Sequence, residues 1–405
     1  MNRSSLLAIV TGIAVLVAIV SLVTRNSTEN SAGTTLNPQV LVQTASQTAG
    51  EVASTVGQTQ STGPDVAANP AAGQGVEQNG LVLPELSPAL LSIFVPLPTE
   101  ATPGNYPMSE ALVQLGRLLF HDPRLSSSQK MSCATCHPLD RFGVDGLTVS
   151  MGRNNVPVKR NAQTVFNAAL HIAQFWDGRS PSVEEQAKIP IVSTAEMALQ
   201  RPATVEALLH TIPGYDPLFA SAFPSDTNPI TYDNVGTAIG AFERRLITPS
   251  RFDRFLVGDR NQLNEQEQRG LQTFIALGCA NCHMGTTVGG LLFKKLGDFE
   301  AYPTSDLGRF EITRSEQDRY VFKVAGLRNV AKTAPYLHDG SIATLEEMVR
   351  IMARYQLGIP ANDAQVADVV VFLNTLTGEL PLQYVAVPPL PPSGPDTAKI
   401  AEGNG

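Results

Sequence analysis

The chain has 405 residues and a formal net charge of -8 at pH 7. This length predicts about two to three domains. The acidic balance argues against binding to nucleic acid, which requires basic surfaces.

The N-terminus carries an uncharged apolar stretch over residues 6–23, preceded by Arg3 and followed by Arg25. It is long enough to span a bilayer as a helix, and no Ala-x-Ala cleavage site stands at its end. We therefore expect residues 1–25 to be a transmembrane anchor whose N-terminus faces the cytoplasm, with a cleaved signal peptide as the alternative. Either interpretation exports the rest of the chain, and the first tethers it to the inner membrane.

We call residues 105–380 the body of the chain. Two segments outside it are expected to form no hydrophobic core of their own. Residues 26–104 are rich in Ser, Thr, Gly, Gln, Asn and Pro, which predicts a flexible, disordered linker. Residues 81–95 within it are more apolar and are expected to dock on the body. The Pro-rich tail, residues 381–405, is expected to be extended.

The body is predicted to be all-α, with one domain over residues 105–250 and a second over 251–380. Apolar residues recur at helical spacing in 111–120 and 268–274, each upstream of a cysteine motif, so the two halves resemble one unit used twice. Sustained strand alternation is absent from the sequence. Further helices are expected over 183–187, 202–211, 217–222, 234–246, 345–352 and 366–376.

Two CxxCH motifs use all four cysteines: Cys133, Cys136 and His137 form the first, and Cys279, Cys282 and His283 the second. Paired thiols at this spacing attach one haem covalently, and the adjacent histidine becomes an axial iron ligand. A zinc site drawn from both motifs is the alternative. The adjacent histidine in each motif favours two c-type haems.

A methionine is the expected sixth ligand of a haem that transfers electrons. Met284 directly follows the second histidine and cannot reach the opposite face of the porphyrin. Met348 and Met352 share a helix face, and spacing alone favours Met352 only modestly.

The ordered chain resembles the bacterial dihaem cytochrome c peroxidases over residues 105–385. The motifs that carry the resemblance are LGRLLFHDPRLS (115–126), SCATCH (132–137), RNAQTVFNAALHIAQFWDGR (160–179), VEEQAKIPIVSTAEM (183–197), CANCH (279–283), DLGRFEIT (306–313), FKVAGLRNVAKTAPYLHDG (322–340) and IMARYQLG (351–358). The resemblance implies a periplasmic enzyme that reduces hydrogen peroxide with electrons from a small cytochrome c or cupredoxin. It also suggests a homodimer.

The resemblance assigns roles to further residues. Met352 takes the position of the electron-transfer haem's methionine, and Trp176 that of the residue between the haems. Gln186 and Glu196 match the polar pair of the peroxide pocket, where a carboxylate acts as general acid and base. His338 resembles a residue near a haem propionate. Asn161, Thr333 and Pro335 match a calcium site between the domains.

One position departs from the family pattern. Many members place a second histidine on the resting peroxidatic haem, and the aligned residue here is Arg153, which is no iron ligand. We therefore expect an iron face that is open or water-bound and needs little or no reductive activation. Met151 and His171 are weaker candidates for a substitute ligand.

Two other functions are considered. A dihaem oxidase of the methylamine-utilisation type, which modifies a partner protein, replaces the axial methionine by tyrosine, and Tyr355 lies nearby. A dihaem electron carrier without catalysis would need a sixth ligand on the first haem, and the sequence offers no obvious one.

Overall fold

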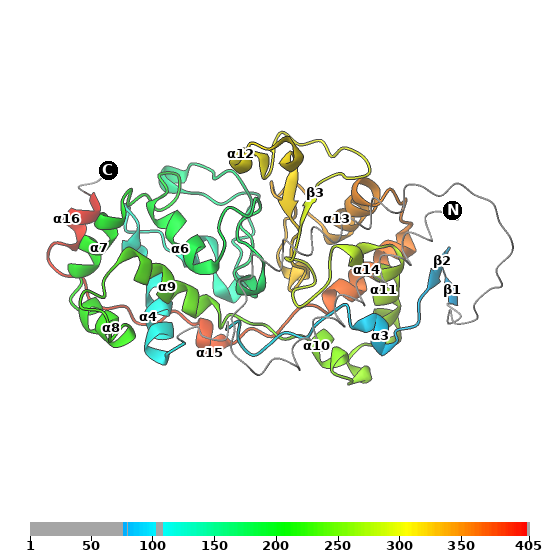
Figure 1. The fold of residues 1–405 in the computed structure, drawn as a ribbon, viewed down its shortest axis with the longest axis horizontal. Helices are drawn as coiled ribbons and strands as arrows, with labels where there is room; N and C mark the ends of the chain where they lie inside the picture. Colours follow the sequence, from blue (N-terminus) through cyan, green and yellow to red (C-terminus); the bar gives the residue numbers. More distant parts are fainter. Residues whose placement is uncertain (1–75, 79, 103–107, 403–405) are drawn as a thin grey trace, which may run out of the picture. The chain divides into compact units, whose positions relative to one another are not determined.

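The computed structural model describes residues 76–78, 80–102 and 108–402, which are mostly helical (Figure 1). The predicted membrane anchor and most of the predicted linker lie outside these residues. Within the described ranges, no helix combines the length and the apolar character that crossing a bilayer requires.

The first core is built on α4 (Glu110–His121) and α9 (Tyr232–Glu243), which pack against each other. Ser109 begins α4, where its side chain accepts a hydrogen bond from the amide of Leu112, a common N-terminal cap. The apolar face of α4 buries Leu112, Leu115 and Leu119 completely or nearly so. The other helices of this core are α5 (Cys133–Cys136), α6 (Val183–Val192), α7 (Pro202–His210) and α8 (Tyr215–Ala222).

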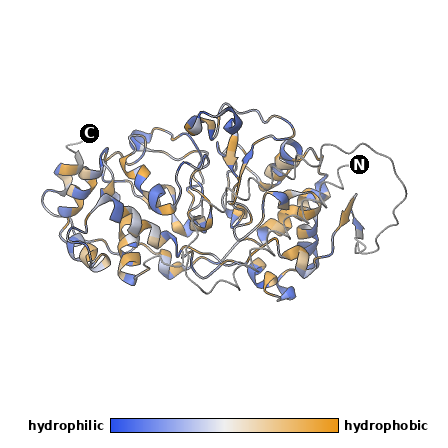
Figure 2. Cartoon of the chain, viewed as in Figure 1, coloured by the Kyte–Doolittle hydropathy of each residue, from blue (hydrophilic) through white to orange (hydrophobic). Residues whose placement is uncertain are grey.

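The second core is built in the same way on α11 (Glu265–Ala276) and α14 (Asp363–Asn374). It also contains α10 (Arg251–Leu256), α13 (Leu345–Ile351) and the π-helical segment η9 (Met352–Gln356). The expected helices in both halves are therefore confirmed, with ends that differ by a few residues. In Figure 2 the helices of both cores carry hydrophobic and hydrophilic residues, as expected for helices with one buried face.

A glycine brings the two main helices of each core into close contact. A Cβ atom on Gly116 of α4 would lie 1.8 Å from the carbonyl oxygen of Ala238 on α9. A Cβ atom on Gly270 of α11 would lie 2.1 Å from the carbonyl oxygen of Asp368 on α14. Since no side chain fits at either distance, both helix pairs depend on the same glycine contact, in line with the expected duplication.

Two small antiparallel sheets depart from the all-α expectation. Strands β1 (Val76–Gln78) and β2 (Leu81–Leu83) form one hairpin. Strands β3 (Phe293–Lys295) and β4 (Val321–Lys323) form the other, with Phe293 opposite Lys323. Strands of three residues are too short to produce a recognisable alternation in the sequence.

The remaining elements are short and connect the larger ones. They are α12 (Phe310–Thr313) and the 3₁₀ turns η1 (Pro123–Leu125), η2 (Leu139–Arg141), η3 (Arg153–Asn155), η4 (Ala168–Leu170), η5 (Arg260–Gln262), η6 (Cys279–Asn281), η7 (Glu316–Asp318) and η8 (Val330–Lys332).

Residues 80–102 belong to the folded part of the chain, although the sequence placed them in the linker. Helix α3 (Pro88–Leu91) and Phe94 bury side chains in the second core, where Phe94 meets Phe252 edge to face at 5.4 Å. The amide of Gly285, two residues after His283, donates to the carbonyl of Ile93. The apolar stretch 81–95 therefore docks on the body as expected.

The C-terminal segment is not simply extended, as the sequence predicted, because it contains α15 (Leu382–Val385) and α16 (Thr397–Glu402). It returns from α14 to the first core, where Val385 is buried and α16 lies beside α7 (Figure 1). The Arg124 guanidinium donates to the carbonyl of Pro391 at 2.7 Å. Backbone carbonyls of an extended segment are free to accept such bonds, which fixes the tail without a long helix.

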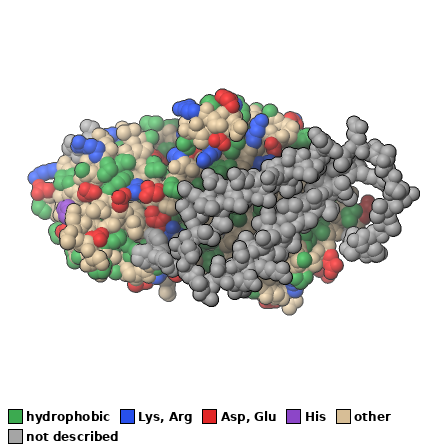
Figure 3. Space-filling model, viewed as in Figure 1, with side chains coloured by type: hydrophobic (Ala, Val, Ile, Leu, Met, Phe, Trp, Pro, Cys, Tyr) green, Lys and Arg blue, Asp and Glu red, His purple; other side chains and the backbone are tan. Residues whose placement is uncertain are grey.

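Acidic and basic side chains are interspersed where described residues are visible in Figure 3.

Candidate functional site

A cavity of about 620 Å³ lies beside the first core and brings the first CxxCH motif together with the predicted peroxide-pocket residues. Cys133, Cys136 and His137 line it, as do Gln186 and Glu196. Gln186 lies on α6, which Ser182 caps, and Glu196 lies in the turn that follows the helix. Residues ten positions apart in sequence thus face one space.

The ring of His137 is held in one orientation. Its Nδ1 lies 3.0 Å from the carbonyl oxygen of Gly143. A carbonyl can only accept, so Nδ1 carries the proton and Nε2 keeps a lone pair for a metal. Burial lowers the pKa of His137, which keeps the ring neutral.

The pKa of Glu196 is raised above its ordinary value. Burial raises its pKa, and a hydrogen bond from Ser193 and the positive charge of Arg179 oppose this shift in part. The Arg179 guanidinium lies 3.4 Å from the centre of the Phe175 ring and pairs with Asp177 at 2.9 Å. Its position is therefore fixed by two neighbours.

Two residues of this cavity were missed by the sequence analysis. Arg179 ends the FWDGR motif and lines the cavity with Phe175. Glu243, on α9, is 4% exposed, and burial raises its pKa to about 8. The sequence gives Glu243 no distinctive spacing, so only the fold reveals that its carboxyl group faces the cavity side of α9.

The loop around Arg153 does not supply a ligand to the first cavity. Its lining residues include Ser150 and Gly152 of this loop, but neither Met151 nor Arg153 is among them. Met151 is 44% exposed, and the amide of Arg153 donates to the carbonyl of Ala195. His171, the other substitute considered, lines the second cavity instead.

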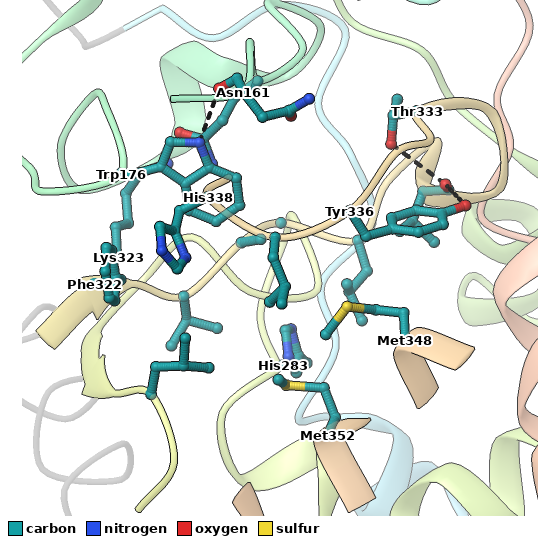
Figure 4. Close-up of a pocket in the computed structure, with 18 of the residues that line it drawn as sticks. Asn161, Trp176, His283, Phe322, Lys323, Thr333, Tyr336, His338, Met348 and Met352 are labelled. Carbon is teal, nitrogen blue, oxygen red and sulfur yellow. Dashed lines mark hydrogen bonds between the residues drawn. The ribbon is translucent and has the colours of Figure 1, made fainter. Parts of the chain in front are cut away.

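The second cavity, of about 200 Å³, is lined by Cys282, His283, Met348 and Met352 (Figure 4). In Figure 4 the sulfur-bearing side chain of Met352 lies close to His283, whereas Met348 lies nearer Tyr336. Burial lowers the pKa of His283 to about 4, although the backbone at Val288 and Ala325 acts to raise it. Met352 begins the π-helical segment η9, whose Tyr355 does not line the cavity.

Trp176 lines both cavities. Its Nε1 donates to the carbonyl of Asn161 at 2.9 Å, and its ring meets that of His338 edge to face with centroids 6.4 Å apart. His338 is 2% exposed and stacks on Phe322 at 4.4 Å. These contacts hold an aromatic group between the two motifs.

The three residues matched to a calcium site, Asn161, Thr333 and Pro335, all line the second cavity. The side-chain amide of Asn161 donates to the carbonyl of Leu147 at 3.0 Å. Within the described residues, no group of three or more His, Cys, Asp or Glu side chains is arranged to hold a metal. A cation here would therefore rely on carbonyl, amide and hydroxyl oxygens.

A buried ion-pair network joins the two halves next to Trp176. Arg160 precedes Asn161 and pairs with Asp306 at 2.7 Å and with Asp177 at 2.5 Å. The side chains of Arg160 and Asp306 are about 10% exposed or less. The network therefore fixes the backbone that accepts the hydrogen bond of Trp176.

Both cavities fit a c-type haem. Each contains a cysteine next to a half-buried, neutral histidine, and the second adds a thioether sulfur from a different helix. These are the ligands that c-type haem iron takes. A tetrahedral zinc site drawn from both motifs is not formed, because the motifs line separate cavities.

The chain is similar to proteins of known family. A family model described as "Di-haem cytochrome c peroxidase" matches residues 110–261. Cytochrome c551 peroxidase of Pseudomonas aeruginosa is 42% identical over 77% of this chain and 91% of its own length. Cytochrome c551 peroxidase of Nitrosomonas europaea is 44% identical over 74% of this chain and 87% of its own. A crystal structure of a MauG-like protein associated with microbial copper homeostasis superposes with a TM-score of 0.63 at 32% identity, covering 72% of this chain and 95% of that one.

Proposed function

This chain belongs to the di-haem cytochrome c peroxidase family, and on that premise we propose that it reduces hydrogen peroxide to two waters with two electrons and two protons. A small cytochrome c or cupredoxin donates the electrons. The enzyme consists of a peroxidatic haem domain (105–250) and an electron-transfer haem domain (251–380).

The haems, when bound, would supply one iron that accepts electrons from the donor and one at which the peroxide O–O bond is cleaved. Cys133, Cys136 and His137 would hold the peroxidatic haem. Cys279, Cys282, His283 and Met352 would hold the other, and His338 would contribute to the pocket wall around it. Trp176 provides the aromatic path between them.

Glu196 handles the protons of the reaction. As a carboxylate it takes the proton from one oxygen of hydrogen peroxide and returns it to the departing oxygen, while the Gln186 amide orients the peroxide by hydrogen bonding. The raised pKa of Glu196 is suited to this role, because a group that titrates nearer the working pH exchanges protons in both directions.

The observation that carries the proposal is the lining of the first cavity. It combines His137 with a carboxyl and an amide group, while Met151, Arg153 and His171 stay out of it. Its volume, about 620 Å³ against about 200 Å³ for the second cavity, leaves space for a substrate. We infer an open or water-bound iron face that needs little or no reductive activation.

Electron paramagnetic resonance of the fully oxidised protein, followed by peroxide turnover without prior reduction, tests this inference. A high-spin signal from one haem with immediate turnover is expected. Two low-spin haems, with turnover only after one is reduced, would contradict an open first haem.

A protein-modifying oxidase of the methylamine-utilisation type is the second candidate, favoured by the likeness to the MauG-like structure. Against it, Met352 rather than Tyr355 lines the second cavity. A Met352→Tyr variant tests the distinction: it should lose peroxidase turnover with a cytochrome donor if the methionine-ligated haem is the point of electron entry. Unchanged turnover would favour the oxidase.

Further features of the enzyme follow from the same premise. We propose that calcium binds at Asn161, Thr333 and Pro335, and that the chain works in the periplasm as a homodimer. The segment 6–23 would tether it to the inner membrane through the linker. Loss of turnover on chelation, restored by calcium but not by magnesium, would support the calcium site, whereas turnover that persists in chelator would exclude it.

A further inference from the structure

Lys323 is a buried cation that the peroxidase mechanism above does not use. It ends β4, is 2% exposed and lines the second cavity together with His283 and Met352. Its backbone amide donates to the carbonyl of Trp176 at 2.7 Å. Figure 4 shows Lys323 beside Phe322, on the Trp176 side of the cavity.

The only side chain hydrogen-bonded to Lys323 in the described part of the chain is a histidine. Its Nζ lies 3.1 Å from Nδ1 of His171. Two glycines make room for that imidazole: a Cβ atom on Gly290 or Gly326 would lie 2.2 or 2.7 Å from the ring. The histidine is therefore held tightly and turned toward the lysine.

The pair lacks a negative charge. Burial keeps the pKa of His171 well below its usual value, so its ring is a neutral acceptor. Burial lowers the pKa of Lys323 to about 8, and no carboxylate of the described residues opposes that shift. At pH 7 the ammonium group is still mainly charged, and two of its three protons are not used by His171.

A buried ammonium ion without an anion is costly, and proteins pair such charges. The occupant assigned to this cavity under the proposed function is a haem, which carries two propionate carboxylates. The other lysines of the cavity do not meet the same need, because Lys294 and Lys295 are exposed and Lys294 already pairs with Asp298.

We propose that Lys323 binds a carboxylate of the haem attached at Cys279 and Cys282, and that His171 positions its ammonium group for this contact. The inference rests on the proposed haem at this site. A fixed positive charge in a water-poor wall also favours the reduced, less positive iron over the oxidised one. Lys323 therefore raises the reduction potential of the electron-accepting haem.

Spectroelectrochemical titration of the holoenzyme tests the proposal with Lys323→Met. At a fixed potential, the ratio of reduced to oxidised Met352 haem should fall about tenfold, which is a shift of about 59 mV for one electron. Lys323→Arg keeps the charge and should stay within threefold of the wild type. Lys295→Met removes an equal charge from the exposed rim of the same cavity and is the matched control, also expected within threefold.

The proposal is overturned if the haem reduction potential of Lys323→Met equals that of the wild type. It is also overturned if Lys295→Met shifts this potential by as much as Lys323→Met does. If Lys323→Met does not retain its haems, Lys323→Gln decides in the same way, since it removes the charge and keeps a polar side chain. A failure of the proposed function is distinguishable, because it shows as absent peroxide turnover in the wild type. If only this inference fails, the wild type still reduces peroxide, and the haem reduction potentials of wild type and Lys323→Met are equal.

Discussion

Replacing Asp306 by Asn tests whether the ion pair with Arg160 stabilises the contact between the two halves. Arg160 donates to the two carboxylate oxygens of Asp306 at 2.7 and 2.8 Å, and the amide of Gly308 donates to one of them at 2.8 Å. Burial raises the pKa of Asp306, but the bonds and charge of Arg160 outweigh burial and hold it at about 2, against an ordinary value of 3.8. At about 1.4 kcal/mol per pKa unit, this difference corresponds to about 2 kcal/mol of folding free energy.

The sign of the pH dependence follows from the lowered pKa. A carboxyl group whose pKa is lower in the folded state stabilises the fold above its unfolded pKa, near 4, and loses that contribution as pH falls through the folded value near 2. The difference in unfolding free energy between wild type and Asp306→Asn should be about 2 kcal/mol at pH 7 and about half as large at pH 3. Urea unfolding monitored by tryptophan fluorescence and far-ultraviolet circular dichroism measures both values.

Glu316→Gln provides a matched control. Glu316 pairs with Arg319 at 2.7 Å, yet its side chain is 73% exposed. Solvent screens such a pair, so no resolvable change in unfolding free energy is expected. The reasoning is refuted if Asp306→Asn has an effect as small as this control, or if its effect is the same at both pH values.

Three further predictions concern the catalytic path. Glu196→Gln should lower kcat/KM for hydrogen peroxide by about 10²–10⁴-fold in stopped-flow assays, because it removes the general acid–base group; a change below threefold would exclude that role. Trp176→Phe removes the hydrogen bond to Asn161. It should slow electron transfer between the haems in flash-reduction experiments and leave peroxide binding unchanged. Equal electron-transfer rates in wild type and variant would argue against a path through the tryptophan. Met352→Ala should lower the reduction potential of the second haem, because methionine ligation raises it; an unaltered potential and absorption spectrum would assign the sixth ligand elsewhere.

Local sequence patterns predicted the helices well, because amphipathic spacing and polar caps are local properties. The runs 111–120 and 268–274 became α4 and α11. The positions of residues 80–102 and of the C-terminal segment were harder to predict. Their stability comes from contacts distant in sequence, such as Arg124 with Pro391, which periodicity does not encode.

The residues of the candidate site also fall into those that the sequence predicts and those that it does not. The CxxCH motifs identify their haems by themselves, since attachment and ligation use adjacent residues. Gln186 and Glu196 could be paired only through the family resemblance, because α6 ends at Val192 and Glu196 lies beyond it. The pair Lys323 and His171, 152 positions apart, could not be predicted, because the two side chains meet, with no carboxylate of the described residues beside them, only when the halves pack.

The two halves use one structural plan for different chemistry. In each, a glycine lets the helix before the CxxCH motif touch the last large helix, which places the motif beside a buried cavity. The difference lies in what else lines the cavity: a carboxyl and an amide group beside His137, and a thioether beside His283. A soft sulfur ligand stabilises reduced iron, whereas a carboxyl group that exchanges protons requires an iron face left open for substrate. Under the proposed function, divergence of these few side chains after duplication of the fold would separate electron entry from peroxide reduction within one chain.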